Sequence, residues 1–572
     1  MLRSVNSFVR TPFGSRQGMR VGLALALFGT FGATGILDTY PRQWGIDALN
    51  YAFEVTFSDD TDRIEGETTV EFRFVQDGVT EFSLDLISAS TALEGKGMTV
   101  SSVTSEGAPL QWSHENDRLR VTLDVSPARG ERHEYTVSYS GVAADGLKIG
   151  PNLHGDRTFF SVNWPNKARQ WLPMIDHPYD KATSEFIVTA PSHYQVVANG
   201  LLKEESDVSE GWRLTHWKQS VPIASWLNAV GVAQFTSRTF GEVDGIALQT
   251  WVFPQDRERG IATFEVPVRQ AIEFFNSHIG PYTYEKLANV QAAGMGGGME
   301  HASAIFYGQT SITDRPATGL VAHEIAHQWF GNAVTESDWD DAWLSEGFAT
   351  YFTHLTREHY SGRDSFISGL IRDKDRIAQM EERLPGQAVV HDNLDDMGRV
   401  LSGIQYQKGG WVLHMLRGQI GTDNFWAGIR DYYATYKDSN ASSADLQRVM
   451  EEASGQELSW FFEQWLHRAP TPVVEGSWSY DASSQSVVVE LTQTQATEPY
   501  TLPFELEIAG DWEADEPEDP RDRRRGDVEP PLERIEMTGA TQRFEIPVKG
   551  RPDSVVLDPN TWILMHVTFG PR

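Results

Sequence analysis

The motif His323-Glu324-Ile325-Ala326-His327 is the feature that most constrains how this chain folds. Residues four apart lie on one face of a helix, so both imidazoles can reach one zinc ion at about 2.0–2.1 Å. Glu324 would then lie beside the open position of the metal. Thr318 is expected to cap this helix, and Gly331-Asn332 is expected to end it. The alternative interpretation is a pair of surface histidines on an ordinary helix.

A catalytic zinc ion needs a third protein ligand and one free position. Glu346, within Trp343–Ala349, is close enough along the chain for a loop to bring a second helix beside the first. We therefore expect one zinc ion per chain, held by His323, His327 and Glu346. The alternative for Glu346 is a solvent-facing helical carboxylate.

The predicted zinc site implies a hydrolytic mechanism. Zinc lowers the pKa of a bound water to about 7. Glu324 is predicted to take the proton of this water and pass it to the leaving amine. Asp341 and Asn332 are candidates to support the histidines from behind, unless both simply cap helices.

The composition narrows the choice of ligands and partners. The 572 residues include no cysteine, so a metal site must use histidine and carboxylates. The 80 acidic and 48 basic residues give a formal net charge of −32, which argues against nucleic acid as a partner. We interpret the excess as a solvated acidic surface, with attraction of basic peptides as the alternative.

The N-terminus has the layout of a secretory signal. Basic residues precede the apolar run 21–37, and the first acidic residue is Asp38. The run is short for a spanning helix, so we expect a cleaved signal peptide and an extracytoplasmic protein, either secreted or periplasmic. An uncleaved membrane anchor is the alternative. The basic residues are Arg3, Arg10, Arg16 and Arg20.

The remaining pattern predicts a multidomain α+β chain. After a lead-in over 1–44, residues 45–251 alternate with period two, as in an antiparallel β-rich domain. Residues 252–470 contain the zinc motif and form a mostly helical domain, and residues 471–572 return to strands. The segments with helical spacing lie around 260–278, 318–330, 345–360, 366–383, 408–418 and 443–468. Residues 511–531, acidic, then basic and rich in proline, are predicted to form a solvated loop, with a docking site for a partner as the alternative.

A second motif narrows the interpretation. Gly297-Gly298-Met299-Glu300-His301 precedes the zinc motif, and WLSEGFA follows it at 343–349. In these segments the chain resembles the aminopeptidase N family of gluzincin zinc peptidases. Further similarity over 168–183, 280–286, 462–473 and 558–564 extends the resemblance to nearly all of the chain after residue 45. It implies an N-terminal β-rich saddle domain, a thermolysin-like catalytic domain and a C-terminal β-sandwich.

The resemblance also implies roles for single residues. Glu300 would bind the free α-amino group of a peptide substrate, which would make the enzyme an aminopeptidase. Gly297, Gly298 and Met299 would line the substrate backbone, since glycine permits close approach. Tyr406 would help to stabilise the oxyanion of the tetrahedral intermediate. The alternatives are a structural salt bridge for Glu300 and a core or surface position for Tyr406.

Two positions depart from the family pattern. His301 replaces the usual asparagine, and Trp164 stands where many relatives have Glu or Gln five residues before the arginine matching Arg169. The same scaffold also allows two other functions, an epoxide hydrolase and a non-catalytic peptide-binding protein. The complete set of motif residues argues against the non-catalytic alternative.

Overall fold

The computed structural model describes residues 38–391, 396–510 and 532–572. The predicted signal segment up to residue 37 and the charged loop 511–531 lie outside the described residues. Within these described ranges, no helix combines the length and the apolar character needed to cross a membrane.

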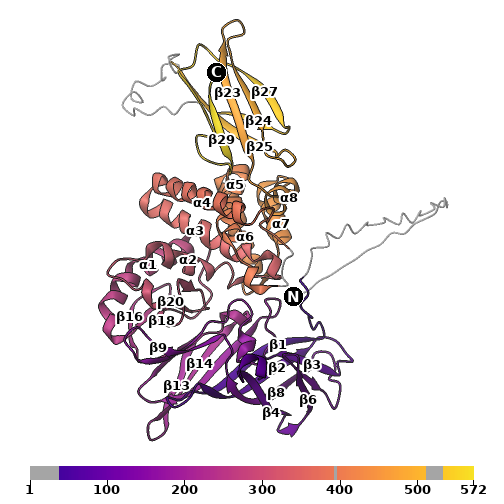
Figure 1. Ribbon diagram of the computed structural model, residues 1–572, viewed down its shortest axis with the longest axis vertical. Coiled ribbons are helices and arrows are strands. Elements are labelled where there is room, and N and C mark those ends of the chain that lie inside the picture. Colours follow the sequence, from indigo (N-terminus) through magenta and orange to yellow (C-terminus); the bar gives the residue numbers. More distant parts are fainter. Residues whose placement is uncertain (1–37, 392–395, 511–531) are drawn as a thin grey trace, which may run out of the picture. The chain divides into compact units, whose positions relative to one another are not determined.

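The chain from residue 46 to 233 is built mainly from strands (Figure 1). In long strands such as β1, β2 and β11, successive side chains alternate between the interior and the surface. The main sheet has the order β13-β14-β11-β1-β2-β8-β4-β5, and β1 pairs in parallel with β11. Two smaller sheets have the orders β12-β15-β10-β9 and β3-β7-β6. The strands are β1 Ile46–Thr56, β2 Arg63–Phe74, β3 Glu81–Asp85, β4 Gly97–Ser105, β5 Ala108–Pro109, β6 Gln111–Glu115, β7 Arg118–Thr122, β8 Arg132–Val142, β9 Leu147–Pro151, β10 Arg157–Ser161, β11 Ala182–Pro191, β12 Gln195–Ala198, β13 Leu201–Ser209, β14 Trp212–Ile223 and β15 Val230–Ala233.

A five-stranded sheet comes before the zinc motif along the chain. Its order is β16-β17-β18-β20-β19, and β18 pairs in parallel with β17 and with β20. The strand β18 is buried along its whole length rather than alternating, and its polar side chains Lys286, Asn289 and Gln291 are hydrogen-bonded in the interior. The strands are β16 Thr236–Val243, β17 Ile246–Val252, β18 Lys286–Ala292, β19 Gly298–Met299 and β20 Ala304–Gly308.

The helices follow the predicted spacing with two differences. The predicted helical segment 443–468 is divided at Gly455, which adopts a left-handed conformation (φ +68°) that glycine tolerates. The helix α6 was not predicted. The helices are α1 Arg257–His278, α2 Thr318–His327, α3 Trp343–Ser361, α4 Arg363–Arg383, α5 Gly409–Ile420, α6 Thr422–Tyr436, α7 Ser443–Ser454 and α8 Ser459–His467, and the strands β21 Val334–Glu336 and β22 Ser439–Ala441 pair between them.

The C-terminal residues form two sheets, β27-β24-β23-β29 and β26-β25-β28. Buried residues of both sheets, such as Leu491 and Phe504, belong to one hydrophobic cluster that continues into the helices through Leu564 and Leu416. The strands are β23 Val473–Asp481, β24 Ser486–Gln493, β25 Leu502–Ala509, β26 Leu532–Met537, β27 Thr541–Pro547, β28 Ser554–Leu557 and β29 His566–Pro571. The predicted α+β class is confirmed, while the boundaries at 251 and 470 stay predictions.

Candidate metal centre

The helix α2 carries His323, Glu324 and His327. Its buried residues include Val321, Ala322, Ile325 and Ala326, so apolar packing holds the helix against the core. The predicted cap is wrong by one residue, because the helix begins at Thr318 and Ala317 occupies the cap position without a side-chain hydrogen bond. The helix also ends earlier than predicted, at His327, and the chain then turns at Gly331 (φ +106°).

Three predicted ligand atoms converge on one point. His323 Nε2 lies 3.2 Å from His327 Nε2, and Glu346 Oε2 lies 3.3 Å from the first and 3.2 Å from the second. Ligand atoms placed tetrahedrally at about 2.0–2.1 Å from a zinc ion would be about 3.3–3.4 Å apart. The spacing of the three atoms therefore fits a zinc ion.

The hydrogen bonds of His327 also fit a cation at this point. Its Nδ1 lies 3.3 Å from the carbonyl of Phe330 and 3.0 Å from Ser345 Oγ. Because a carbonyl can only accept, Nδ1 carries the proton, and the lone pair of Nε2 points toward Glu346. A carboxylate oxygen facing this nitrogen requires positive charge between the two atoms, which a zinc ion supplies and which, without the metal, a second proton on the imidazole supplies.

The residues that support the candidate metal ligands by hydrogen bonds differ from those predicted. Asp341 accepts hydrogen bonds from the backbone and hydroxyl of Ser443, at the start of α7, so its predicted support of a histidine is wrong. Asn332 donates to the carbonyl of Glu300 at 2.6 Å and also does not contact the imidazoles. Ser345, which sequence reasoning missed, supports His327 instead. Its position directly before Glu346 was the available signal.

Two further carboxyls are buried at the same place. An oxygen of Glu324, one of Glu300 and a nitrogen of His327 lie within 4.8 Å of one another. Burial raises the pKa of Glu324 well above its ordinary value and also raises that of Glu300, although His327 opposes both shifts. For Glu346, the effect of burial is outweighed by His327 and His323, which hold its pKa below the ordinary range. The site therefore contains one strongly ionised carboxylate and two carboxyls that retain protons more readily.

Glycines bring the backbone close to this cluster. A Cβ added at Gly298, in β19, would lie 2.2 Å from Glu324 Oε1, so only glycine fits without displacing that carboxyl. Gly297 has a φ of +67°, which favours glycine. Met299 is buried and pairs with Phe306 of β20, which holds the strand in register.

Tyr406 stacks its ring beside the imidazole of His323. It belongs to the π-helical turn Ile404–Lys408, and its ring is 6.1 Å from that of His323. Burial raises the pKa of the Tyr406 hydroxyl, and Glu346 raises it further, so the phenol stays protonated. A close approach of Gly347 in α3 to Gly409 brings this turn beside the ligand helix, since a Cβ at Gly347 would meet Gly409 at 2.8 Å.

Of the two positions that depart from the family pattern, His301 is fully buried and Trp164 is half-buried. His301 is fully buried against Phe306, with a ring distance of 4.7 Å, and burial lowers its pKa to about 3. Within the described residues neither of its ring nitrogens has a hydrogen-bond partner. Trp164 packs edge-on against Trp226 and Trp339, at 5.3 and 5.1 Å. Neither side chain replaces a charged anchor for an amine.

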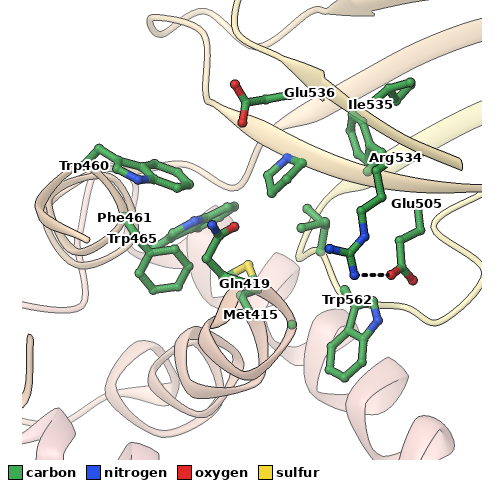
Figure 2. Close-up of a pocket in the computed structure, with 14 residues that line it drawn as sticks. Met415, Gln419, Trp460, Phe461, Trp465, Glu505, Arg534, Ile535, Glu536 and Trp562 are labelled. Atoms are coloured by element: carbon green, nitrogen blue, oxygen red, sulfur yellow. Dashed lines mark hydrogen bonds and ion pairs between the residues drawn. The ribbon is translucent and has the colours of Figure 1, made fainter. Parts of the chain in front are cut away.

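A separate cavity of about 250 Å³ lies between α5, α8 and the C-terminal strands. Figure 2 shows Trp460, Trp465 and Trp562 around it, with Arg534 turned toward Glu505 at 3.5 Å. None of the predicted site residues lines this cavity.

Comparison with known protein families shows which family the chain belongs to. The model of the peptidase M1 N-terminal domain matches residues 47–227, and the model of the peptidase family M1 domain matches residues 264–465, so that together they cover more than half of the chain. The chain belongs to peptidase family M1. The predicted resemblance is confirmed, and membership agrees with the predicted enzyme class, a zinc-dependent hydrolase of peptide bonds.

Relatives of this M1 chain include glutamyl aminopeptidases and an archaeal protein. Glutamyl aminopeptidase of Rattus norvegicus is 27% identical over 364 residues, which cover 61% of this chain and 38% of the relative. Tricorn protease-interacting factor F2 of Thermoplasma acidophilum is 27% identical over 67% of this chain and 50% of its own length. The chain thus spans half or less of the length of these relatives.

A solved structure shares the fold of the M1 chain. The M1 zinc metallopeptidase from Deinococcus radiodurans superposes with a TM-score of 0.64 and 24% identity, over 75% of this chain and 95% of the other.

Proposed function

We propose that this chain is a zinc-dependent aminopeptidase that removes the N-terminal residue from peptides. The observation that carries the proposal is the convergence of His323 Nε2, His327 Nε2 and Glu346 Oε2 within 3.3 Å of one another. In this proposal the three residues hold one zinc ion. When bound, zinc would lower the pKa of a water molecule and polarise the scissile carbonyl.

Glu324 is the proposed general base. Its carboxyl is buried, lies on the same helix as the two histidines, and lies against the backbone at Gly298. A raised pKa suits a group that must take a proton in one step and return it to the leaving amine in the next. Tyr406, whose hydroxyl keeps its proton, is proposed to donate a hydrogen bond to the developing oxyanion.

Glu300 is the proposed partner of the substrate's free α-amino group. It is buried at the end of β19, and its carbonyl is held by Asn332 and Gln328 at 2.6 and 2.8 Å. A buried carboxyl is a favourable partner for an ammonium group and a poor neighbour for a peptide carbonyl. Gly297, Gly298 and Met299 would form the adjoining edge for the substrate backbone.

The wider assignments are also proposals. We divide the chain into a β-rich domain (45–251), a catalytic domain (252–470) and a C-terminal β-sandwich (471–572), and we infer an extracytoplasmic location from the predicted signal. No observation on the described residues favours epoxide hydrolysis over peptide hydrolysis.

The proposal is tested with Glu324→Gln and a panel of aminoacyl-naphthylamides. We expect the variant to retain zinc, measured by metal analysis, and to lose at least 10³-fold in kcat, because the ligands remain while the base is gone. Wild-type enzyme should release the first residue of a peptide with a free N-terminus but not of its acetylated form. Equal turnover by variant and wild type would contradict the role of Glu324.

A further inference from the structure

The segment Asp38–Gln43, called here the N-terminal strap, is joined by buried charges to Asp338, which precedes the helix α3. Arg42 donates from Nη1 to Asp38 Oδ1 and from Nη2 to Asp338 Oδ2, both at 2.9 Å. The backbone N–H of Asp38 also donates to Asp338 Oδ2, at 3.1 Å. Asp338 therefore accepts two hydrogen bonds from the strap.

The strap is also bound to the β-rich part of the chain. The imidazole of His177 accepts from the amide of Tyr179 at Nδ1, so its Nε2–H donates to Asp38 Oδ2, at 2.6 Å. Tyr40 stacks on the same imidazole at 4.5 Å, and its hydroxyl donates to Asp85. The strap thus bridges the β-rich residues and Asp338.

Asp338 stands at the entrance to the helix that carries Glu346. Its other oxygen, Oδ1, accepts from the amide of Asp340 at 3.2 Å and caps the short 3₁₀ turn Trp339–Asp341. This turn leads directly into α3, which has Glu346 in its first turn. A short, hydrogen-bonded path along the chain therefore joins Asp338 to the first turn of α3.

Burial makes these ion pairs different from ordinary surface pairs. The side chains of Asp38, Arg42 and Asp338 are only 5%, 6% and 8% exposed. Removing one member of a buried, hydrogen-bonded set leaves an uncompensated charge, and the surrounding chain must move to solvate it. Loss of Arg42 would leave the carboxylates of Asp38 and Asp338 facing each other.

We propose that Arg42 is a positioning residue for the metal centre, acting through Asp338 on the first turn of α3. The inference rests on the proposed aminopeptidase function. It requires that the strap be in place for Glu346 to meet His323 and His327 at the observed distances.

The experiment compares Arg42→Met with Arg73→Met in the full chain. Arg73 is a matched control, because it also pairs with an aspartate, Asp47, but its side chain is 47% exposed. We expect Arg42→Met to lower kcat at least tenfold with KM within twofold, and Arg73→Met to leave both unchanged. Arg42→Lys keeps the charge but not the planar fork, and should recover part of the loss.

Amide hydrogen exchange over residues 338–346 provides a readout that does not depend on activity. Exchange should be faster in Arg42→Met than in Arg73→Met, and Asp338→Asn combined with Arg42→Met should lose no more kcat than the more damaging single change. If Arg42→Met does not fold, Arg42→Lys takes its place and should lose kcat severalfold.

Two results would overturn the inference: equal kcat in the Arg42 and Arg73 variants, or unchanged exchange over 338–346. A wild-type chain without aminopeptidase turnover would instead refute the proposed function. The strap would then be judged by exchange alone, with faster exchange supporting it and unchanged exchange refuting it.

Discussion

At the scale of single residues, neighbouring groups divide the buried carboxyls of the metal centre into two kinds. Glu346 lies against two imidazoles and is held ionised, while Glu324 and Glu300 are dominated by desolvation and keep protons more readily. The residue types are the same, so only their surroundings can separate the proposed metal ligand from the proposed base and the proposed amine anchor.

Ser345 offers a direct test of how the ligand His327 is oriented. Its hydroxyl lies 3.0 Å from Nδ1 of His327, and loss of such an outer hydrogen bond typically weakens metal binding 10–100-fold. We expect Ser345→Ala to bind zinc about tenfold more weakly in a chelator competition. The control is Thr353→Ala on the same helix, whose hydroxyl bonds only the backbone of Ala349. Equal zinc affinity of both variants would refute the role of Ser345.

Asp180 should make stability depend on pH at a place away from the metal centre. Burial raises its pKa from 3.8 to about 8, and the charge of Asp47 adds to the shift. Tyr51 and Tyr179 are the other titratable groups beside it. Between about pH 4 and 8 the folded chain binds a proton that the unfolded chain has lost, so stability falls as pH rises through this window.

The variant Asp180→Asn does not titrate and should escape this loss. Relative to wild type, its free energy of unfolding should rise by on the order of a few kcal/mol between pH 5 and pH 8.5. Denaturant unfolding at several pH values, with saturating zinc, measures the difference. A difference that does not change with pH would show that Asp180 is ionised in the folded chain throughout.

At the scale of elements, the site depends on backbones that touch where glycine allows it. The strand β19 lies against Glu324 at Gly298, and α3 meets the turn of Tyr406 at Gly347. These contacts explain how residues from a strand, two helices and a π-helical turn reach one point. A side chain at either glycine would push the elements apart.

Gly298→Ala is therefore expected to damage catalysis more than folding. The new Cβ would lie 2.2 Å from Glu324 Oε1, and the carboxyl must move away from its working position. We expect kcat to fall at least tenfold while zinc content stays unchanged. Gly296→Ala is the matched control, since an added Cβ there meets nothing within 4 Å. Similar kcat values for the two variants would mean that the contact has no catalytic effect.

At the scale of the whole molecule, stability rests on packing and metal binding rather than on covalent cross-links, since the chain has no cysteine. One hydrophobic cluster runs from the residues of the zinc helix into the C-terminal strands. Two histidines and a carboxylate that face one another, without an ion between them, place lone pairs and negative charge in contact. The metal is therefore expected to stabilise the fold as well as to serve catalysis.

Metal removal tests this coupling. A strong chelator should lower the thermal unfolding midpoint of the wild-type chain by several degrees, because an ion bound only to the folded state stabilises it by mass action. The same treatment should leave His327→Ala unchanged, since that variant lacks a ligand. An unchanged midpoint in the wild type would argue that the ion contributes little to the fold.

Much of the fold and of the candidate metal centre could be predicted from the local sequence. Spacing of four residues places His323 and His327 on one helical face, alternation predicts the strands of 45–251, and helical spacing predicts most helices. Several features depend on distant contacts and could not be predicted in this way. Asn332 turned to Glu300 rather than to an imidazole, and Asp341 accepted hydrogen bonds at the start of α7. The helix α6, in contrast, was missed although Phe425, Ile429 and Tyr432 have helical spacing.

The sequence alone determined the type of chemistry, because two imidazoles and a carboxylate with no thiol in the chain leave few metals and few reactions. The tertiary structure decided which polar residues are buried and what they contact. Ser345, which contacts His327, and the Arg42–Asp338 pair are hydrophilic residues like many others in the sequence, and only their burial distinguishes them. Burial is a property of the folded chain, produced by contacts between residues as far apart as 42 and 338, which local patterns do not record.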